Sequence, residues 1–251
     1  MKVLIDNILV NYNVFGQGDQ DILLLHGWGS QGSSFDQWVL LLDQAKYRYI
    51  IPDLPGFGDS ERPQEDWGIE DYAKHLTNFL QKLDSNPKIV LGHSMGGRIA
   101  IYLAANKMLK LHKLLLIGAH GFKDRSFSRK IKVVIAKLGK VSTSVMPVKV
   151  QEGLKRQYYQ LIGSTDYLNT GSMKQIFLNI INQDLSTQAT MIDIPTLLIY
   201  GSNDDQTPVS YGKQYNELIK DSVLKVIGGS GHYAFIDKPR MVAEIVREFI
   251  G

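Results

Sequence analysis

The sequence IVLGHSMGGRIAIYLAA, residues 89–105, places a serine between a short apolar run and a stretch typical of a helix. Gly92 and Gly96 flank Ser94, as a strand that turns sharply into a helix requires. Such a turn, a nucleophile elbow, exposes the serine hydroxyl, and the N-terminus of the following helix faces the position of a developing oxyanion. The stretch predicts a catalytic serine, and a glycine-rich turn that happens to contain serine is the alternative.

The composition is that of a globular protein. Hydrophobic residues make up 44% and charged residues 21% of the 251 residues, and no apolar run approaches the ~20 residues of a membrane span. The N-terminus meets an acid at Asp6 before a signal-peptide core could form, and the chain has no cysteine for disulfides, thiolate metal sites or a thiol nucleophile. We therefore expect a cytoplasmic protein, and the net charge of +3 is too small to predict nucleic-acid binding.

Short apolar runs alternate with stretches of helical periodicity over most of the chain. This alternation predicts an α/β fold with a mostly parallel sheet and helices on both faces, in which chemistry occurs at the carboxyl ends of the strands. The predicted strands are 8–14, 22–25, 49–51, 89–91, 114–117, 197–200 and 224–227, and the predicted helices are 35–42, 72–83, 95–106, 209–219 and 239–249.

Residues 121–193 interrupt this alternation with helix-compatible segments only. We predict that they form a helical cap, or lid, inserted into a core domain made of residues 1–120 and 194–251. Residues 120–160 hold ten Lys or Arg against two acids, and the stretch 127–138 has the spacing of a basic amphipathic helix. Its basic face is either a solvated surface or a weak contact for acidic substrates, carrier proteins or anionic lipid surfaces.

A serine nucleophile needs a base to take its proton and an acid to orient that base. His232 is the best base among the six histidines because its glycine-rich loop follows the last predicted strand. Asp204 follows the strand 197–200 and is the preferred acid, with Asp205 as the alternative. The chain order of Ser94, Asp204 and His232 is the order used by folds that have a nucleophile elbow.

The remaining histidines are weaker candidates for the base. His120 could face the cleft, whereas His26 is expected to be a structural hydrogen-bonding residue and His93 is expected to turn its side chain away from the serine. Two main-chain N–H groups are also needed to bind the oxyanion, and we assign them to Trp28 and Met95. A tight turn with a packing tryptophan is the alternative for the stretch HGWGS, residues 26–30.

These motifs, together with DLPGFGDS at 53–60, resemble the α/β-hydrolase superfamily along nearly the whole chain. The resemblance implies an eight-stranded sheet with a cap after the sixth strand, and a triad of Ser94, Asp204 and His232. Some relatives carry the acid after the sixth strand, but here that strand ends in GAH, residues 118–120, which favours Asp204. Asp53 is assigned no catalytic role, and the chemistry needs no cofactor or metal.

Within the superfamily the motifs are similar to small bacterial carboxylesterases, and SMGGR at 94–98 is also similar to lyases of menaquinone synthesis. We expect a serine hydrolase, monomeric or homodimeric, that cleaves small acyl esters or lactones through an acyl-enzyme and has no stable membrane insertion. A carbon-carbon hydrolase or lyase with the same triad is one alternative, and a non-catalytic receptor is another. The predicted substrate-binding residues are Trp28, Tyr158, Phe177 and Tyr233.

Overall fold

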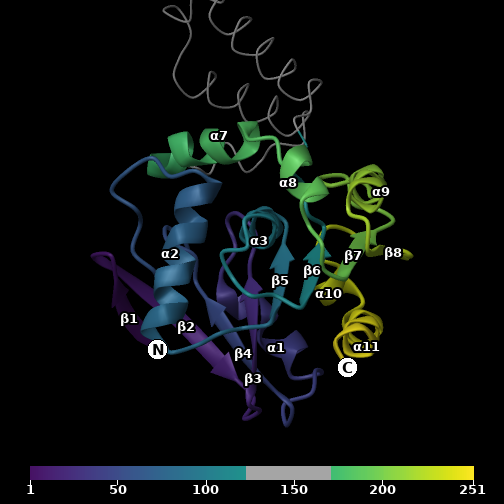
Figure 1. Ribbon diagram of the computed structural model, residues 1–251, viewed down its shortest axis with the longest axis horizontal. Helices are drawn as coiled ribbons and strands as arrows, with labels where there is room; N and C mark the ends of the chain where they lie inside the picture. Colours follow the sequence, from purple (N-terminus) through teal and green to yellow (C-terminus); the bar gives the residue numbers. More distant parts are fainter. Residues whose placement is uncertain (123–170) are drawn as a thin grey trace, which may run out of the picture.

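The computed structural model describes residues 1–122 and 171–251, which form a sheet with helices on both faces (Figure 1). The strands are β1 (Lys2–Ile5), β2 (Ile8–Phe15), β3 (Gln20–Leu25), β4 (Tyr47–Pro52), β5 (Ile89–His93), β6 (Lys113–Ile117), β7 (Thr196–Gly201) and β8 (Ser222–Ile227). The helices are η1 (Gly32–Phe35), α1 (Asp36–Val39), α2 (Ile69–Lys82), α3 (Met95–Ala105), η3 (Gly171–Met173), α7 (Lys174–Asn182), α8 (Ser186–Thr190), α9 (Val209–Leu218), α10 (Ala234–Asp237) and α11 (Pro239–Ile250). Tyr158 and the basic helix expected at 127–138 lie outside the described residues.

The sheet has eight strands in the order β1-β2-β4-β3-β5-β6-β7-β8. β1 pairs with β2 and β2 with β4 in antiparallel fashion, and every other pairing is parallel. The prediction of a mostly parallel sheet is therefore confirmed. Because β3, β5, β6, β7 and β8 run in the same direction, the loops that follow them gather at one edge.

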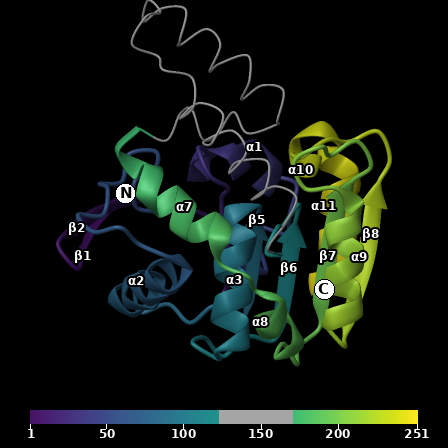
Figure 2. The same cartoon turned by 90° about the horizontal axis from the view of Figure 1, so that it is seen from above.

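The central strands are buried on both faces and separate two apolar layers. Leu23 and Leu25 of β3 pack into the layer that contains α2, α3, α8 and α9, whereas Ile22 and Leu24 pack into the layer that contains α1, α10 and α11. This alternation is the period-2 geometry of a strand, and the view in Figure 2 shows the helices on either side of the sheet.

The structure differs from the sequence prediction mainly at the short elements. The expected helix 35–42 is a 3-10 turn, η1, followed by the single turn α1. The edge strand β1 and the short helix α10 were not predicted. β1 turns into β2 through Asp6 and Asn7, both at positive φ, which gives an antiparallel edge. None of the helices among the described residues is long and apolar enough to cross a membrane.

Part of the region predicted as a cap is described. After residue 170 the chain forms η3, α7 and α8 before it enters β7. Figure 1 shows α7 lying across the end of the sheet toward which β5 and β6 point. This end is the one at which the predicted functional residues emerge, because Ser94, Asp204 and His232 follow β5, β7 and β8.

Candidate functional site

Ser94 lies at the turn between β5 and α3 in a strained backbone conformation, with φ 50° and ψ −112°. A Cβ atom at Gly92 would lie 2.4 Å from the carbonyl oxygen of Gly96, and one at Gly96 would lie 2.2 Å from that of Leu25. Both contacts are too close for any side chain, which explains the two glycines around the serine. A positive φ at a non-glycine residue is uncommon and, at a turn of this kind, indicates a functional position.

The surroundings of Ser94 fix its main chain while leaving the residue partly exposed. Its N–H donates to the carbonyl oxygen of Ile117, the last residue of β6, over 3.0 Å. α3 starts at Met95, so the Met95 N–H is among the first four of that helix, which lack partners within it. The predicted turn from strand to helix at Ser94 is present in the structure, and the role of the Met95 amide in binding an oxyanion stays a prediction.

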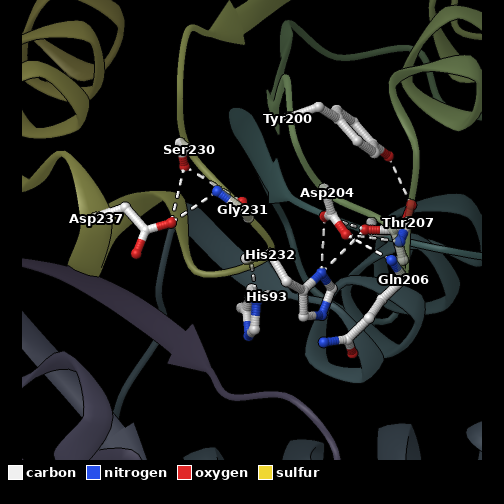
Figure 3. A network of polar contacts seen from close by, with 10 residues as sticks. His93, Tyr200, Asp204, Gln206, Thr207, Ser230, Gly231, His232 and Asp237 are labelled. Atoms are coloured by element: carbon white, nitrogen blue, oxygen red, sulfur yellow. Dashed lines mark hydrogen bonds and ion pairs between the residues drawn. The ribbon is translucent and has the colours of Figure 1, made fainter. Parts of the chain in front are cut away.

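His232 and Asp204 form a buried hydrogen-bonded pair at the ends of β8 and β7 (Figure 3). Nδ1 of His232 lies 2.8 Å from Oδ2 of Asp204. Because an ionised carboxylate can only accept, Nδ1 carries the proton, and in a neutral imidazole Nε2 is then the acceptor. Asp205, the alternative acid, is exposed, whereas Asp204 is 6% exposed. The geometry favours Asp204.

Four hydrogen bonds converge on the Asp204 carboxylate. Oδ1 accepts from the N–H groups of Gln206 and Thr207 at 2.9 and 2.8 Å, and Oδ2 accepts from the Thr207 hydroxyl at 2.6 Å in addition to His232. Burial by itself would raise the pKa of Asp204, but the bonds from His232 and Thr207 outweigh it and lower the pKa below its ordinary value. Asp204 is thus held ionised next to the histidine.

Ser94 and this pair both border the end of β6. Gly118 follows Ile117, which binds the Ser94 amide, and a Cβ atom at Gly118 would lie 3.2 Å from both Cε1 and Nδ1 of His232. The ring of His93 lies 4.7 Å from the ring of His232, centroid to centroid. Ser94, Asp204 and His232 thus lie after β5, β7 and β8 at one edge of the sheet, and their joint role as a triad stays a prediction.

His93 contacts the loop that carries His232. Its Nε2 donates to the carbonyl oxygen of His232 over 3.1 Å, and its ring also packs against Tyr233. Burial, together with the nearby His232, holds the pKa of His93 well below its ordinary value, so the residue is neutral. His120, the second candidate base, packs instead against Tyr211 and lies 3.3 Å from a guanidinium nitrogen of Arg98.

The loop after β3 is held by buried hydrogen bonds. His26 accepts from the N–H of Leu54 at Nε2 and donates from Nδ1 to the carbonyl oxygen of Gly27, at 2.9 and 2.8 Å. Burial lowers the pKa of His26 to about 4, which fits the structural role expected for it. Asp53 accepts from the N–H groups of Gly32 and Asp59, and so holds two loops together.

Trp28 is part of an aromatic cluster beside the loop that follows β3. Its ring centroid lies 4.9 Å from Phe57 and 4.9 Å from Phe177 of α7, both in edge-to-face geometry. Tyr233, directly after His232, packs against the rings of His93 and His232. Of the predicted substrate-binding residues, Tyr233 contacts His232, Trp28 and Phe177 contact each other, and Tyr158 falls outside the described residues.

Two positioning residues were missed in the sequence. Thr207 donates to Asp204 and also lies 3.1 Å from Nδ1 of His232, so it touches both members of the pair. Asp237 of α10 accepts from the N–H of Gly231 at 2.7 Å and thereby holds the loop that carries His232 (Figure 3). A threonine three residues after Asp204 is a weak signal, and only the fold brings it to the histidine.

Comparisons with known proteins identify the fold and several relatives. A family model described as the alpha/beta hydrolase fold matches residues 22–138. The pimeloyl-(acyl-carrier protein) methyl ester esterase of Vibrio campbellii is 28% identical over 260 residues, which cover 96% of this chain and 98% of the relative. The 2-hydroxy-6-oxo-6-(2'-aminophenyl)hexa-2,4-dienoic acid hydrolase of Metapseudomonas resinovorans is 23% identical over 250 residues, 94% of this chain and 85% of the relative.

A solved structure of an esterase from Exiguobacterium antarcticum has the same fold. Its TM-score is 0.77 at 22% sequence identity, and the match covers 99% of this chain and 98% of that one. The relatives are therefore named for different substrates, a methyl ester and a dienoic acid.

Proposed function

The chain belongs to the α/β-hydrolase superfamily, and on this premise we propose that it is a serine hydrolase that cleaves carboxylic esters. The observation that carries the proposal is the hydrogen-bonded pair of Asp204 and His232 beside the strained turn at Ser94. A carboxylate, an imidazole and a serine at one edge of the sheet are the groups that acyl transfer requires.

In the proposed mechanism Ser94 attacks the ester carbonyl while Nε2 of His232 takes its proton. Asp204 holds the proton on Nδ1 of His232 and stabilises the imidazolium that forms. The main-chain N–H groups of Trp28 and Met95 bind the oxyanion of the tetrahedral intermediate. His232 then returns the proton to the departing alcohol, and a water molecule that it activates hydrolyses the acyl-enzyme and frees the acid.

An acyl ester or a lactone fits the surroundings of Ser94 better than a charged substrate. Trp28 lies in the loop assigned to the oxyanion and packs against the buried rings of Phe57 and Phe177, and an aromatic cluster beside that loop favours an apolar acyl group. The similarity to a methyl ester esterase supports the same bond type. We also propose that residues 121–193 form a cap, and that its described part contributes Phe177 to this aromatic cluster.

The test is a fluorophosphonate probe combined with a panel of nitrophenyl esters and lactones. The wild-type protein is expected to be labelled once, at Ser94, and to turn over at least one ester class, whereas Ser94→Ala is expected to lose both labelling and turnover. Asp205→Asn serves as the matched control for Asp204→Asn, because only the buried carboxylate contacts His232. Labelling that survives in Ser94→Ala would refute the proposal.

A carbon-carbon hydrolase is the second candidate, because one relative is named for cleaving a dienoic acid. In that reaction Ser94 and His232 would move protons on a vinylogous diketone and an ester would be a poor substrate. Rapid-mixing kinetics distinguish the two candidates. A burst of nitrophenol followed by slower turnover supports an acyl-enzyme, whereas turnover of the diketone without an ester burst supports carbon-carbon cleavage.

A further inference from the structure

Arg98 is a buried arginine in the first turn of α3, four residues after Ser94, and it is 3% exposed. Its Nη2 donates to the carbonyl oxygens of Ile180 and Gln183, both at 2.5 Å. Its Nη1 donates to the carbonyl oxygen of His120 at 3.0 Å. One guanidinium therefore joins the nucleophile helix to the segment that leaves β6 and to the segment that returns after residue 170.

The charge of Arg98 is balanced by main-chain carbonyls. Over residues 1–122 and 171–251 it forms no ion pair with a carboxylate. Burial lowers the pKa of Arg98 to about 10, so it remains charged at neutral pH. Ile180 and Gln183 lie at the C-terminal end of α7, where unpaired carbonyl groups and the negative end of the helix dipole favour a cation.

The position of α7 matters for the site because α7 carries Phe177. Phe177 lies one turn before Ile180, is 6% exposed, and packs edge-to-face against Trp28 with ring centroids 4.9 Å apart. Trp28 in turn contacts Phe57, which follows β4. Figure 2 shows α7 passing over the end of the sheet with its C-terminal end near α3. Arg98 thus contacts the end of α7, and α7 in turn contacts, through Phe177, the loop assigned to the oxyanion.

We propose that Arg98 is a positioning residue that fixes α7, and with it Phe177, over Trp28, and that it thereby sets how tightly the acyl group of the substrate is bound. The acyl-binding half of this inference rests on the proposed ester hydrolysis. Burying the guanidinium costs desolvation free energy, and its hydrogen bonds to the carbonyl groups offset that cost. A buried charge of this kind is therefore expected where the contacts that it makes are needed. Arg98 touches no substrate atom in this proposal and acts through α7.

Arg98→Met removes the donors and keeps much of the volume, and Arg98→Lys keeps the charge but reaches fewer carbonyls. Arg48→Met is the control, because Arg48 forms a two-point ion pair with Asp21 whose arginine side chain is 44% exposed. Two measurements are made on each variant and on the wild type. One is hydrogen–deuterium exchange of peptides that cover α7, α2 and α11, and the other is kcat and KM for nitrophenyl acetate and nitrophenyl octanoate.

In Arg98→Met the α7 amides are expected to exchange about tenfold faster, with α2 and α11 unchanged, because local opening requires only the bonds of the guanidinium to break. KM for the octanoate is expected to rise about tenfold and KM for the acetate less than about threefold, with kcat little changed. Arg98→Lys should lie between wild type and Arg98→Met in both measurements, and Arg48→Met should match the wild type.

Unchanged hydrogen–deuterium exchange in α7 of Arg98→Met would overturn the proposal. An equal rise of KM for nitrophenyl acetate and nitrophenyl octanoate would also overturn it. If Arg98→Met does not fold, the same two criteria apply to Arg98→Lys. Failure of the proposed function is recognised separately. A wild-type protein that hydrolyses neither ester contradicts ester hydrolysis, and the exchange measurement then still decides whether Arg98 fixes α7.

Discussion

The Nε2 atom of His93 donates a hydrogen bond to the main-chain carbonyl oxygen of His232 over 3.1 Å. The residue before Ser94, the proposed nucleophile, therefore holds the loop of the histidine that is proposed to activate it. A carbonyl oxygen cannot donate, so the proton lies on Nε2, in agreement with a neutral ring whose pKa burial holds well below the ordinary value. This hydrogen bond joins the end of β5 to the loop that carries His232, in addition to the pairing of the strands in the sheet.

Replacing His93 tests whether this bond is needed for catalysis. His93→Leu fills a similar volume but cannot donate, and we expect kcat to fall about tenfold because His232 is less well oriented toward Ser94. His93→Gln places an amide nitrogen near the position of Nε2 and should restore most of the rate. Steady-state kinetics with a nitrophenyl ester give the comparison, and equal rates in the two variants would show that the donor has no role.

The pKa of His26 predicts how stability depends on pH. The folded pKa is about 4 and the ordinary value is 6.5, so the unfolded state binds the proton more readily. Stability is therefore fully present above pH 6.5 and is lost as the pH falls toward 4, by about 3 kcal/mol for this residue. His93, whose pKa is also lowered, contributes in the same direction.

Urea unfolding at a series of pH values between 7 and 4 measures this slope. His26→Gln can still accept from Leu54 but does not titrate, so its free energy of unfolding should fall less steeply than that of the wild type. The variant is expected to be less stable than the wild type at pH 7 and closer to it at pH 4. Parallel curves for the two proteins would contradict the assignment of the slope to His26.

The sequence was sufficient to predict the strands that are buried on both faces, because runs such as 22–25 and 114–117 are continuously apolar. It was insufficient for β1, whose four residues alternate in exposure at the sheet edge and are paired only through β2. The expected helix 35–42 failed for a related reason. Only η1 and one turn of α1 form before the chain leaves the helical conformation.

For the candidate site, sequence reasoning placed each group at a strand end but could not find the residues that hold it. Thr207 is three residues from Asp204 in the chain, and its contact with His232 depends on the pairing of β7 with β8. Arg98 has the sequence position of an ordinary helix residue, and its partners Ile180 and Gln183 are remote in the chain. Such contacts depend on tertiary packing, which local patterns do not encode.

Thr207 provides a test of the Asp204–His232 pair that leaves both residues intact. Thr207→Val removes the hydroxyl that donates to Asp204 Oδ2 and leaves the shape nearly unchanged. We expect kcat to fall about tenfold. The pKa of Asp204 should also rise, because Thr207 is one of the groups that lower it, so the loss of activity in acid should begin at a higher pH.

Thr207→Ser is the matched control for this substitution, since it keeps the hydroxyl and loses only a methyl group. Its rate and its pH–rate profile are expected to follow those of the wild type. The profile discriminates between the two explanations for a loss in Thr207→Val. A lower rate with an unshifted acid limb would mean that the valine disturbs packing without acting on the carboxylate.

The substitution Gly118→Ala tests how closely the end of β6 approaches His232. An alanine Cβ there would lie 3.2 Å from Cε1 and Nδ1 of His232 and 3.2 Å from Oγ1 of Thr207, at a φ of +54°. Gly171 has a similar φ of +49° but nothing within 4 Å of an added Cβ. Both alanine variants should lose about 1 kcal/mol of stability from the positive φ. Only Gly118→Ala should also lose kcat, by about tenfold or more, because its methyl group displaces the imidazole. Thermal unfolding and ester kinetics on the pair separate backbone strain from displacement of His232, and full activity in Gly118→Ala would place the histidine farther from β6 than this structure does.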